Sequence, residues 1–338
     1  MPIDGVDDAP RIGLVLGGGA ARGWAHLGAI EELEKMGITP DLISGCSIGS
    51  IVGAFYAAGK LQDLRDFADN LTMIDMVEFF DFTWKNGGLI GGGKVISWFQ
   101  SHLDSPTIEG LEIPFAAVAA DIRTGREVWL REGSLSDAMR ASIAIPGLLT
   151  PWSAGGCWLS DGGLVNPLPI SLARAMEADI VIAVDLNAGV FRDGGTQASE
   201  LVPSSDEPQV LLHSWLDDLA EHLPKSLKET TRKMLRDLLR KRDRGPQQYE
   251  VISNAIAIMS DRITKSRLEG EPADVLLTPS LGEIGAMEFF KAADAIAAGA
   301  EAVKLMRPQI EAALGHSLPG PNTLGKSQEH TQIEGDGS

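Results

Sequence analysis

The sequence is poor in cysteine and has no long apolar run. Two cysteines in 338 residues cannot build a disulfide framework, and they are too few for a structural zinc site with about four nitrogen or sulfur ligands. No stretch approaches the ~18 apolar residues of a membrane-spanning helix. The acidic start of the chain also lacks the apolar core of a signal peptide. These absences predict a protein of a reducing compartment, and we expect it in the cytoplasm.

Basic residues are scarce as well. The 29 Lys and Arg stand against 47 Asp and Glu, a net charge of −18, which argues against nucleic-acid binding because that needs a basic footprint. Residues 225–244 are the exception, with nine basic and three acidic side chains, a net of +6. Their apolar residues recur at helical spacing. This segment is either a solvated amphipathic helix packed on the core or a peripheral contact with an anionic membrane.

Short apolar runs alternate with helical patterns along the chain. Residues 11–16 and 41–46 have the composition of buried strands, and helical patterns follow them at 24–36 and 48–58. Later strands are expected at residues 113–120, 126–131, 180–186 and 273–278, and one long Ala-rich helix at 289–313. Strands separated by helices predict a three-layer α/β/α domain with a mostly parallel central sheet.

Composition also suggests the limits of this domain. Residues 1–10 are expected to form a flexible N-terminus, residues 11–314 the domain, and residues 315–338 a disordered C-terminal tail. The α/β alternation is interrupted at about 188–270 by helical, charged sequence, which we interpret as an insertion.

A glycine-rich turn follows the first predicted strand and precedes the first predicted helix. Its residues are Gly17, Gly18, Gly19, Ala20, Ala21, Arg22 and Gly23. A dinucleotide-binding turn would need a different glycine spacing and an acidic residue after the second strand, and a phosphate-binding loop would need Lys and Ser or Thr after its last glycine. Two interpretations remain: a tight structural turn, or an oxyanion hole whose N–H groups bind the negative oxygen of an acyl-transfer intermediate.

The second motif is a G-x-S-x-G sequence where the second strand meets its helix. Gly45 and Gly49 flank Ser47, the arrangement of a nucleophile elbow, in which a sharp turn exposes the serine hydroxyl. A serine needs a base. None of the six histidines stands at a convincing strand end, and His26 has the pattern of a packed helix residue. A carboxylate does follow an apolar run, at Asp161, Gly162 and Gly163, although this is also the sequence of an ordinary turn.

Together these motifs resemble the patatin-like phospholipase family, in its bacterial and neuropathy-target-esterase branch. The resemblance includes Trp24–Gly28 and the segment from Met139–Ser142 to Pro146–Gly147, and it extends over residues 11–186, with weaker similarity to about 280. It implies a hydrolase of lipid or fatty-acyl esters that uses a Ser–Asp dyad and an acyl-enzyme, with no metal and no cofactor.

The resemblance also implies roles for single residues. Ser47 is then the nucleophile and Asp161 the base, the glycine turn is the oxyanion hole, and Arg22 is its positive companion. Ala20 stands where the family has a third glycine, so we expect the amides of Gly18 and Gly19 to be donors first and that of Ala20 second. Because an Asp with the ordinary pKa of ~3.9 is a poor base, we expect a dry site that raises this pKa.

Two other functions are open at this stage. One is a carboxylesterase of the α/β-hydrolase type, which would depend on a histidine and would have its elbow after several strands. The other is a non-catalytic lipid- or partner-binding protein on the same scaffold. The aromatic-rich residues 79–99 are expected either to wall an acyl-chain pocket or to pack in the core.

Overall fold

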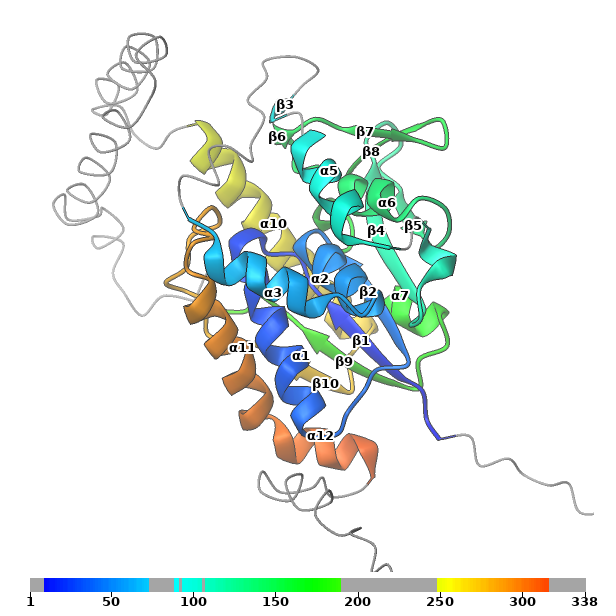
Figure 1. Cartoon of the computed structure of the whole chain (residues 1–338), viewed down its shortest axis with the longest axis vertical. Helices are drawn as coiled ribbons and strands as arrows, with labels where there is room; N and C mark the ends of the chain where they lie inside the picture. The colour runs from blue at the N-terminus through cyan, green and yellow to red at the C-terminus, as the bar shows by residue number, and fades with distance from the viewer. Residues whose placement is uncertain (1–8, 73–87, 91–92, 105–106, 190–247, 316–338) are drawn as a thin grey trace, which may run out of the picture. The chain divides into compact units, whose positions relative to one another are not determined.

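The computed structural model describes residues 9–72, 88–90, 93–104, 107–189 and 248–315 (Figure 1). The chain divides into two compact units, residues 1–190 with 255–338, and residues 191–254. The sheet and the site residues described below belong to the first unit. Residues 1–8, 316–338 and the basic segment 225–244 lie outside the described residues, so the predicted termini, the insertion and the domain limits stay predictions.

The strands come at the positions where the apolar runs predict them, with a few short additions. Those of the main sheet are β1 (Ile12–Leu16), β2 (Leu42–Cys46), β4 (Phe115–Asp121), β5 (Glu127–Leu130), β7 (Trp152–Ala154), β8 (Cys157–Asp161), β9 (Ile180–Val184) and β10 (Val275–Leu277). A second, two-stranded sheet pairs β3 (Gly88–Ile90) with β6 (Gly147–Leu149).

Helices fill most of the connections. The α-helices are α1 (Ala25–Lys35), α2 (Ile48–Ala57), α3 (Leu61–Asn70), α5 (Gly93–His102), α6 (Leu135–Ser142), α7 (Ile170–Ala175), α10 (Gln248–Gly270), α11 (Ala292–Leu305) and α12 (Arg307–Leu314). Short 3₁₀ turns occupy η1 (Ala20–Trp24), η2 (Ile108–Gly110) and η3 (Gly162–Leu164).

The main sheet is parallel in its centre and antiparallel at one side. Its order is β10-β9-β1-β2-β4-β8-β7, with β5 paired to β4. The first five of these strands are parallel, whereas β5, β7 and β8 pair antiparallel. The predicted mostly parallel sheet is therefore confirmed.

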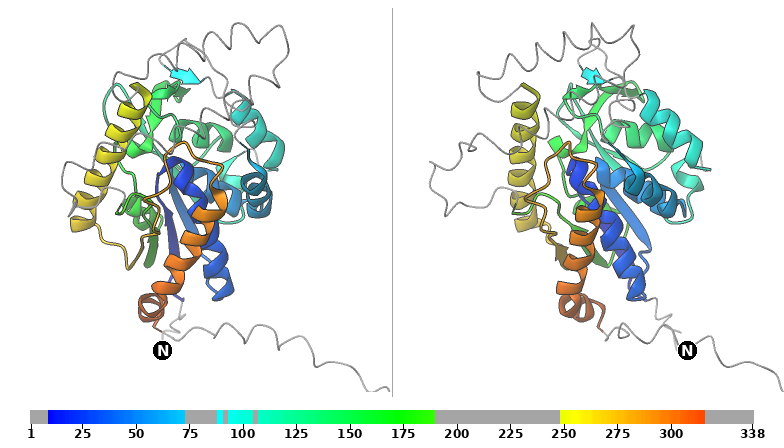
Figure 2. Two further views of the ribbon diagram at one scale, coloured as in Figure 1. Left: turned by 90° about the vertical axis from the view of Figure 1, so that its left-hand side faces the viewer. Right: turned by 60° about the vertical axis from the view of Figure 1, so that its left-hand side comes forward.

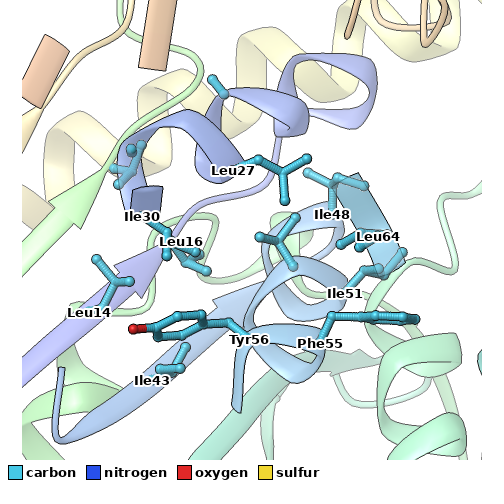
Figure 3. Close-up of a cluster of buried hydrophobic side chains, with 14 of the residues drawn as sticks. Leu14, Leu16, Leu27, Ile30, Ile43, Ile48, Ile51, Phe55, Tyr56 and Leu64 are labelled. Atoms are coloured by element: carbon cyan, nitrogen blue, oxygen red, sulfur yellow. The ribbon is translucent and has the colours of Figure 1, made fainter. Parts of the chain in front are cut away.

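Helices cover both faces of the sheet, which confirms the three-layer architecture. On one face, Leu14 and Leu16 of β1 pack with residues of α1 and α2 (Figure 3). Helix α11 contributes Ile296 and Val303 to the same cluster. On the other, Val15 of β1 packs with Ile170 of α7 and Leu268 of α10. Successive residues of a strand point to opposite faces, so the continuous apolar run in β1 serves both layers. Figure 2 shows α10 on one side of the sheet and α1 with α11 on the other.

The prediction of one helix over residues 289–313 is wrong in its continuity. The structure has α11 and α12, separated at Met306, with a proline near the start of α12. Pro308 lacks the N–H that a continuous helix would donate to the fourth residue before it. The proline therefore ends one helix and begins the next.

Helices α1 and α11 approach at backbone distance. A Cβ added to Gly28 would collide with the carbonyl oxygen of Ile296, and one added to Gly299 would collide with that of Ala25. Glycine at both positions thus lets the two helices pack against each other without intervening side chains.

We predict that Gly28→Ala destabilises the fold although alanine is the better helix former. Overpacking of a close contact costs ~1–3 kcal/mol, which outweighs the ~1 kcal/mol gained in helix propensity. Urea unfolding measures the change. Gly270→Ala is the control, because nothing lies within 4 Å of a Cβ at that position. Equal stability of Gly28→Ala and wild type would contradict the close approach.

Candidate active site

Ser47 stands in a strained turn between β2 and α2. Its φ of 53° and ψ of −124° lie in a region that side chains other than glycine rarely adopt. A Cβ on Gly45 would come within 2.6 Å of the Gly49 oxygen, and one on Gly49 would collide with the Leu16 oxygen. The two glycines of the G-x-S-x-G sequence are therefore needed for the sharp turn, as a nucleophile elbow requires.

Strand β4 brings Ser47 and Asp161 together. On one edge of β4, Cys46 at the end of β2 pairs with Val118, and Asp161 at the end of β8 pairs with Ala119. The opposite edge carries β5. Because β2 runs parallel and β8 antiparallel to β4, their carboxyl ends meet at adjacent positions. Ser47, which follows β2, and Asp161, which ends β8, are therefore side by side, although 114 residues separate them in the sequence.

The two side chains form a short hydrogen bond. Ser47 Oγ donates to Asp161 Oδ2 at 2.6 Å, and the N–H of Gly163 donates to Asp161 Oδ1 at 2.7 Å. Exposed fractions are 5% for Ser47 and 3% for Asp161. Both carboxylate oxygens thus have a partner, and one of them is aligned to accept the serine proton.

Burial raises the pKa of Asp161 to about 6, while the hydrogen bonds from Ser47 and Gly163 act in the opposite direction. Removing a carboxylate from water disfavours its charged form. The expectation of a dry site with a raised Asp pKa is therefore met. Beside it, burial and the charge of Asp161 raise the pKa of the Cys46 thiol, so this cysteine stays protonated.

Of the first four N–H groups of the glycine turn, two have acceptors among the described residues. Gly17 donates to Val184 O at 3.1 Å and Gly18 to Pro167 O at 2.9 Å. Among the described residues, no acceptor is found for the N–H groups of Gly19 and Ala20. The expected order of donors, Gly18 and Gly19 first, is changed accordingly: Gly18 is already engaged, which leaves the amides of Gly19 and Ala20.

The Arg22 side chain points to a different partner from the one expected. Its Nε donates to Ile284 O at 2.9 Å, and burial lowers the pKa of the guanidinium. None of its hydrogen bonds within the described residues reaches Ser47 or Asp161. Arg22 therefore anchors the turn to residues that precede α11. The next residue, Gly23, allows η1 to pack against Ile48, because a Cβ on Gly23 would collide with the Ile48 side chain.

An apolar cavity of about 130 Å³ opens at Ser47. Apart from Ser47, its wall consists of apolar and aromatic side chains. Among these, the indole Nε1 of Trp24 donates to Phe289 O. The other lining residues are Ala20, Ile48, Ile51, Leu64, Phe67, Leu71, Trp98, Phe99, Ile143, Ile145, Leu148, Leu149, Met287 and Phe289. Trp98 and Phe99, from the aromatic-rich stretch, therefore line this cavity, and Phe99 also packs in the core. Residues 79–87 lie outside the described residues.

The described histidines have structural contacts. His26 Nε2 lies 2.8 Å from Gly17 O, and burial lowers the pKa of its imidazole to about 4. His102 stacks on Trp98. His213, His222, His316 and His330 lie outside the described residues. The described residues hold no group of His, Cys, Asp and Glu side chains placed to bind a metal ion.

Sequence reasoning missed several contacts that support the site. Ser142 Oγ accepts from the Ser47 N–H at 2.9 Å and donates to Val118 O at 2.7 Å. Ser260 Oγ, on α10, donates to Gly163 O at 3.1 Å. Ser142 belongs to a segment of the family resemblance, which marked it for attention. Ser260 falls in the predicted insertion, and no local pattern there points to the site.

Comparison with known proteins identifies the class. The family model of patatin-like phospholipases matches residues 14–174. Residues 14–174 are therefore a patatin-like phospholipase domain, as the motifs predict. Such a domain is consistent with a lipid acyl hydrolase.

Individual relatives differ in how much of their length this chain spans. NTE family protein Rv1063c of Mycobacterium tuberculosis is 29% identical over 332 residues, 86% of this chain and 89% of that protein. Patatin-like phospholipase domain-containing protein 6 of Mus musculus is 34% identical over 197 residues, 56% of this chain but 14% of that protein. The crystal structure of VipD from Legionella pneumophila aligns with 91% of this chain and 77% of its own at a TM-score of 0.39 and 13% identity, too distant to support an argument.

Within the part of the chain that the structure describes, no helix combines the length and the apolar character needed to span a bilayer.

We predict that Asp161→Asn stabilises the fold at alkaline pH. The carboxyl has a pKa of about 6 in the fold and ~3.9 in the unfolded chain, so the folded state binds its proton more tightly. The free energy of unfolding therefore falls as pH rises from ~4 through 6. Asparagine does not ionise, so the variant should be more stable than wild type at pH 8, by up to ~3 kcal/mol, and the difference should vanish below pH ~4.

Urea unfolding at pH 4, 6 and 8 measures this difference. Asp121→Asn is the matched control, because the Arg123 N–H and the Thr124 hydroxyl lower the pKa of Asp121. That variant should lose stability relative to wild type at pH 8, the opposite sign. A pH-independent difference for Asp161→Asn would show that the carboxylate is not desolvated.

Proposed function

We propose that this protein is a serine acyl hydrolase of lipids, a phospholipase, lysophospholipase or esterase, which uses Ser47 and Asp161 as a catalytic dyad. The proposal is carried by one observation: the 2.6 Å hydrogen bond between Ser47 Oγ and Asp161 Oδ2, beside an apolar cavity that Ser47 lines. A nucleophile, a base with a pKa near neutrality and an apolar cavity are the parts that acyl-ester hydrolysis needs.

The first half-reaction forms an acyl-enzyme. Ser47 Oγ attacks the ester carbonyl carbon, and its proton passes to Asp161 Oδ2. The negative charge on the carbonyl oxygen is received by the N–H groups of Gly19 and Ala20, which have no acceptor within the described residues. The tetrahedral intermediate then collapses. Its bond to the leaving oxygen breaks, and Asp161 returns the proton to the alcohol or lysolipid.

The second half-reaction releases the acid. A water molecule gives a proton to Asp161 and attacks the acyl carbon, and the same amides bind the new oxyanion. The bond to Ser47 breaks, and the proton returns to Ser47 Oγ. A pKa of about 6 for Asp161 suits both directions of transfer, because such a base is ionised at neutral pH and still accepts a proton.

The cavity wall supports a fatty-acyl substrate. Burial of an alkyl chain against side chains such as Ile51, Phe67 and Phe99 is favourable by ~0.8 kcal/mol per methylene group. We therefore assign this cavity to a fatty-acyl chain whose carbonyl lies at Ser47.

We predict that Ser47→Ala and Asp161→Asn each reduce hydrolysis of a short-chain p-nitrophenyl ester by ~10³-fold or more, because either change disables the dyad. The two losses should not add in the double variant, since the residues act as a unit. Initial rates and labelling by a fluorophosphonate probe measure the effect.

Matched controls remove an equivalent group outside the dyad. Ser44→Ala deletes a buried hydroxyl on β2 that donates to Pro169 O, and Asp121→Asn changes a carboxylate at the end of β4. Both should keep activity within about threefold of wild type. Turnover by Ser47→Ala near the wild-type rate would refute the assignment, and an inactive wild type that binds lipid would favour a non-catalytic protein.

The α/β-hydrolase alternative requires a histidine. Ser47 already has Asp161 as its partner, and His26 is engaged with Gly17 O. In addition, the elbow follows the second strand, whereas the α/β-hydrolase fold has several strands before it. These contacts support the Ser–Asp dyad over a Ser–His–Asp triad.

Contact with an anionic membrane through residues 225–244, with the protein otherwise in the cytoplasm, is also proposed. Each basic residue near such a surface contributes ~1 kcal/mol. The combined change of Arg232, Lys233, Arg236 and Arg240 to Gln should reduce co-sedimentation with anionic vesicles and spare hydrolysis of a soluble ester. Equal pelleting of wild type and variant would mean that this segment is an ordinary solvated helix.

A further inference from the structure

One buried amide outside the dyad contacts the glycine turn. Asn187 Nδ2 donates to Gly18 O at 2.9 Å. Asn187 follows β9, lies 169 residues from Gly18 and is 4% exposed. The hydrogen bond therefore ties the turn after β1 to the end of the neighbouring strand.

Asn187 is itself held in place. Its backbone N–H donates to Asp185 Oδ1 at 2.9 Å, while Asp185 N donates to Leu277 O at the end of β10. The residue between them, Leu186, packs closely on the turn. A Cβ added to Gly19 would come within 2.7 Å of the Leu186 Cβ. The donor amide of Asn187 thus sits on a segment fixed to β10 and against the turn.

The hydrogen bond determines the direction of a neighbouring N–H group. Gly18 O and the Gly19 N–H belong to the same peptide unit, which is trans because the described residues contain no cis peptide. In a trans peptide the C=O and N–H bonds point in opposite directions. With Gly18 O held toward Asn187, the Gly19 N–H must point away from the end of β9.

The sheet order shows what lies on that other side. β1 lies between β9 and β2, Asn187 follows β9, and Ser47 follows β2. A Cβ on Gly18 would lie 3.4 Å from Ser47 Cβ, so the turn and the elbow are in contact there. A Gly19 N–H directed away from Asn187 is therefore directed toward the side that holds Ser47.

We propose that Asn187 is a positioning residue, which orients the Gly18–Gly19 peptide so that its N–H can bind the oxyanion formed at Ser47. This inference rests on the proposed hydrolase function and deepens it. Asn187 does not touch the substrate, and it acts through the peptide that it holds.

The following peptide is held in a comparable way by the turn itself. Gly19 O accepts from the Arg22 N–H at 3.2 Å, which leaves the Ala20 N–H on the opposite side of that unit. Arg22 acts there with its backbone, whereas the Gly18–Gly19 peptide depends on a side chain. Among the described contacts that orient the amides of Gly19 and Ala20, the one from Asn187 comes from a side chain. A substitution can therefore remove it.

The test is Asn187→Leu, which keeps a similar side-chain size and removes the donor. Loss of an oxyanion-hole donor reduces kcat ~10²–10³-fold, and we expect a loss of ~10–100-fold because Gly19 stays present but is misdirected. KM for the short-chain ester should stay within about twofold. Ser44→Ala is the control, since it also deletes a buried side-chain hydrogen bond to a backbone carbonyl, Pro169 O, and it should leave kcat unchanged.

Two ketone inhibitors separate positioning from a general loss of structure. An alkyl trifluoromethyl ketone forms an oxyanion on Ser47, so its Kd should rise about as much as kcat falls. The corresponding methyl ketone has the same chain, and its Kd should not change. An unaltered kcat, or equal losses for both ketones and KM, would overturn the proposal. If Asn187→Leu does not fold, Asn187→Asp is measured at pH 8, where a carboxylate facing Gly18 O should give the same pattern.

The design keeps this inference apart from the proposed function. If wild type does not hydrolyse the ester, or if Ser47→Ala retains activity, the hydrolase proposal itself fails. If wild type is active, Ser47→Ala is inactive and Asn187→Leu is unaffected, only the role of Asn187 fails.

Discussion

The register along one edge of β4 is the constraint on which the site depends. Two strands of opposite direction share that edge, and their ends meet at Val118 and Ala119. A shift of either strand by one residue would turn its side chains to the other face of the sheet and would break the bond between Ser47 and Asp161. Ser142 stabilises this junction, because its hydroxyl hydrogen-bonds both to the Ser47 N–H and to Val118 O of β4.

Burial of this junction has two opposing effects. A carboxylate removed from water is unfavourable, which is why the pKa of Asp161 rises to about 6, and the hydrogen bonds from Ser47 and Gly163 compensate for only part of that cost. The same dryness makes each remaining dipole more effective, because electrostatic interactions are stronger at low dielectric constant. Stability and the proposed chemistry thus place different demands on one side chain, as is common in active sites.

Local patterns predicted much of this arrangement, and long-range contacts account for what was missed. The strand–helix alternation and the elbow around Ser47 depend on neighbouring residues, so they are readable from the chain. The partner of the Gly18 amide is Pro167, and that of Arg22 is Ile284, 262 residues away; neither can be found from spacing. Asn187 and Ser260 escaped notice for the same reason. The helix break before Pro308, in contrast, follows from a local rule about proline and was predictable.

The backbone conformation of Ala20 affects the rigidity of the site. Its φ is 51°, a conformation that glycine adopts with less strain, and its residue lines the cavity beside Ser47. Glycine would relax that strain but would also widen the range of orientations open to the amide. In the proposed mechanism, the methyl group leaves the peptide fewer alternatives, so less entropy would be lost when the oxyanion forms. Alanine in place of the family's third glycine would then make the turn a stiffer receptor, with its disorder removed at folding rather than at each encounter with substrate.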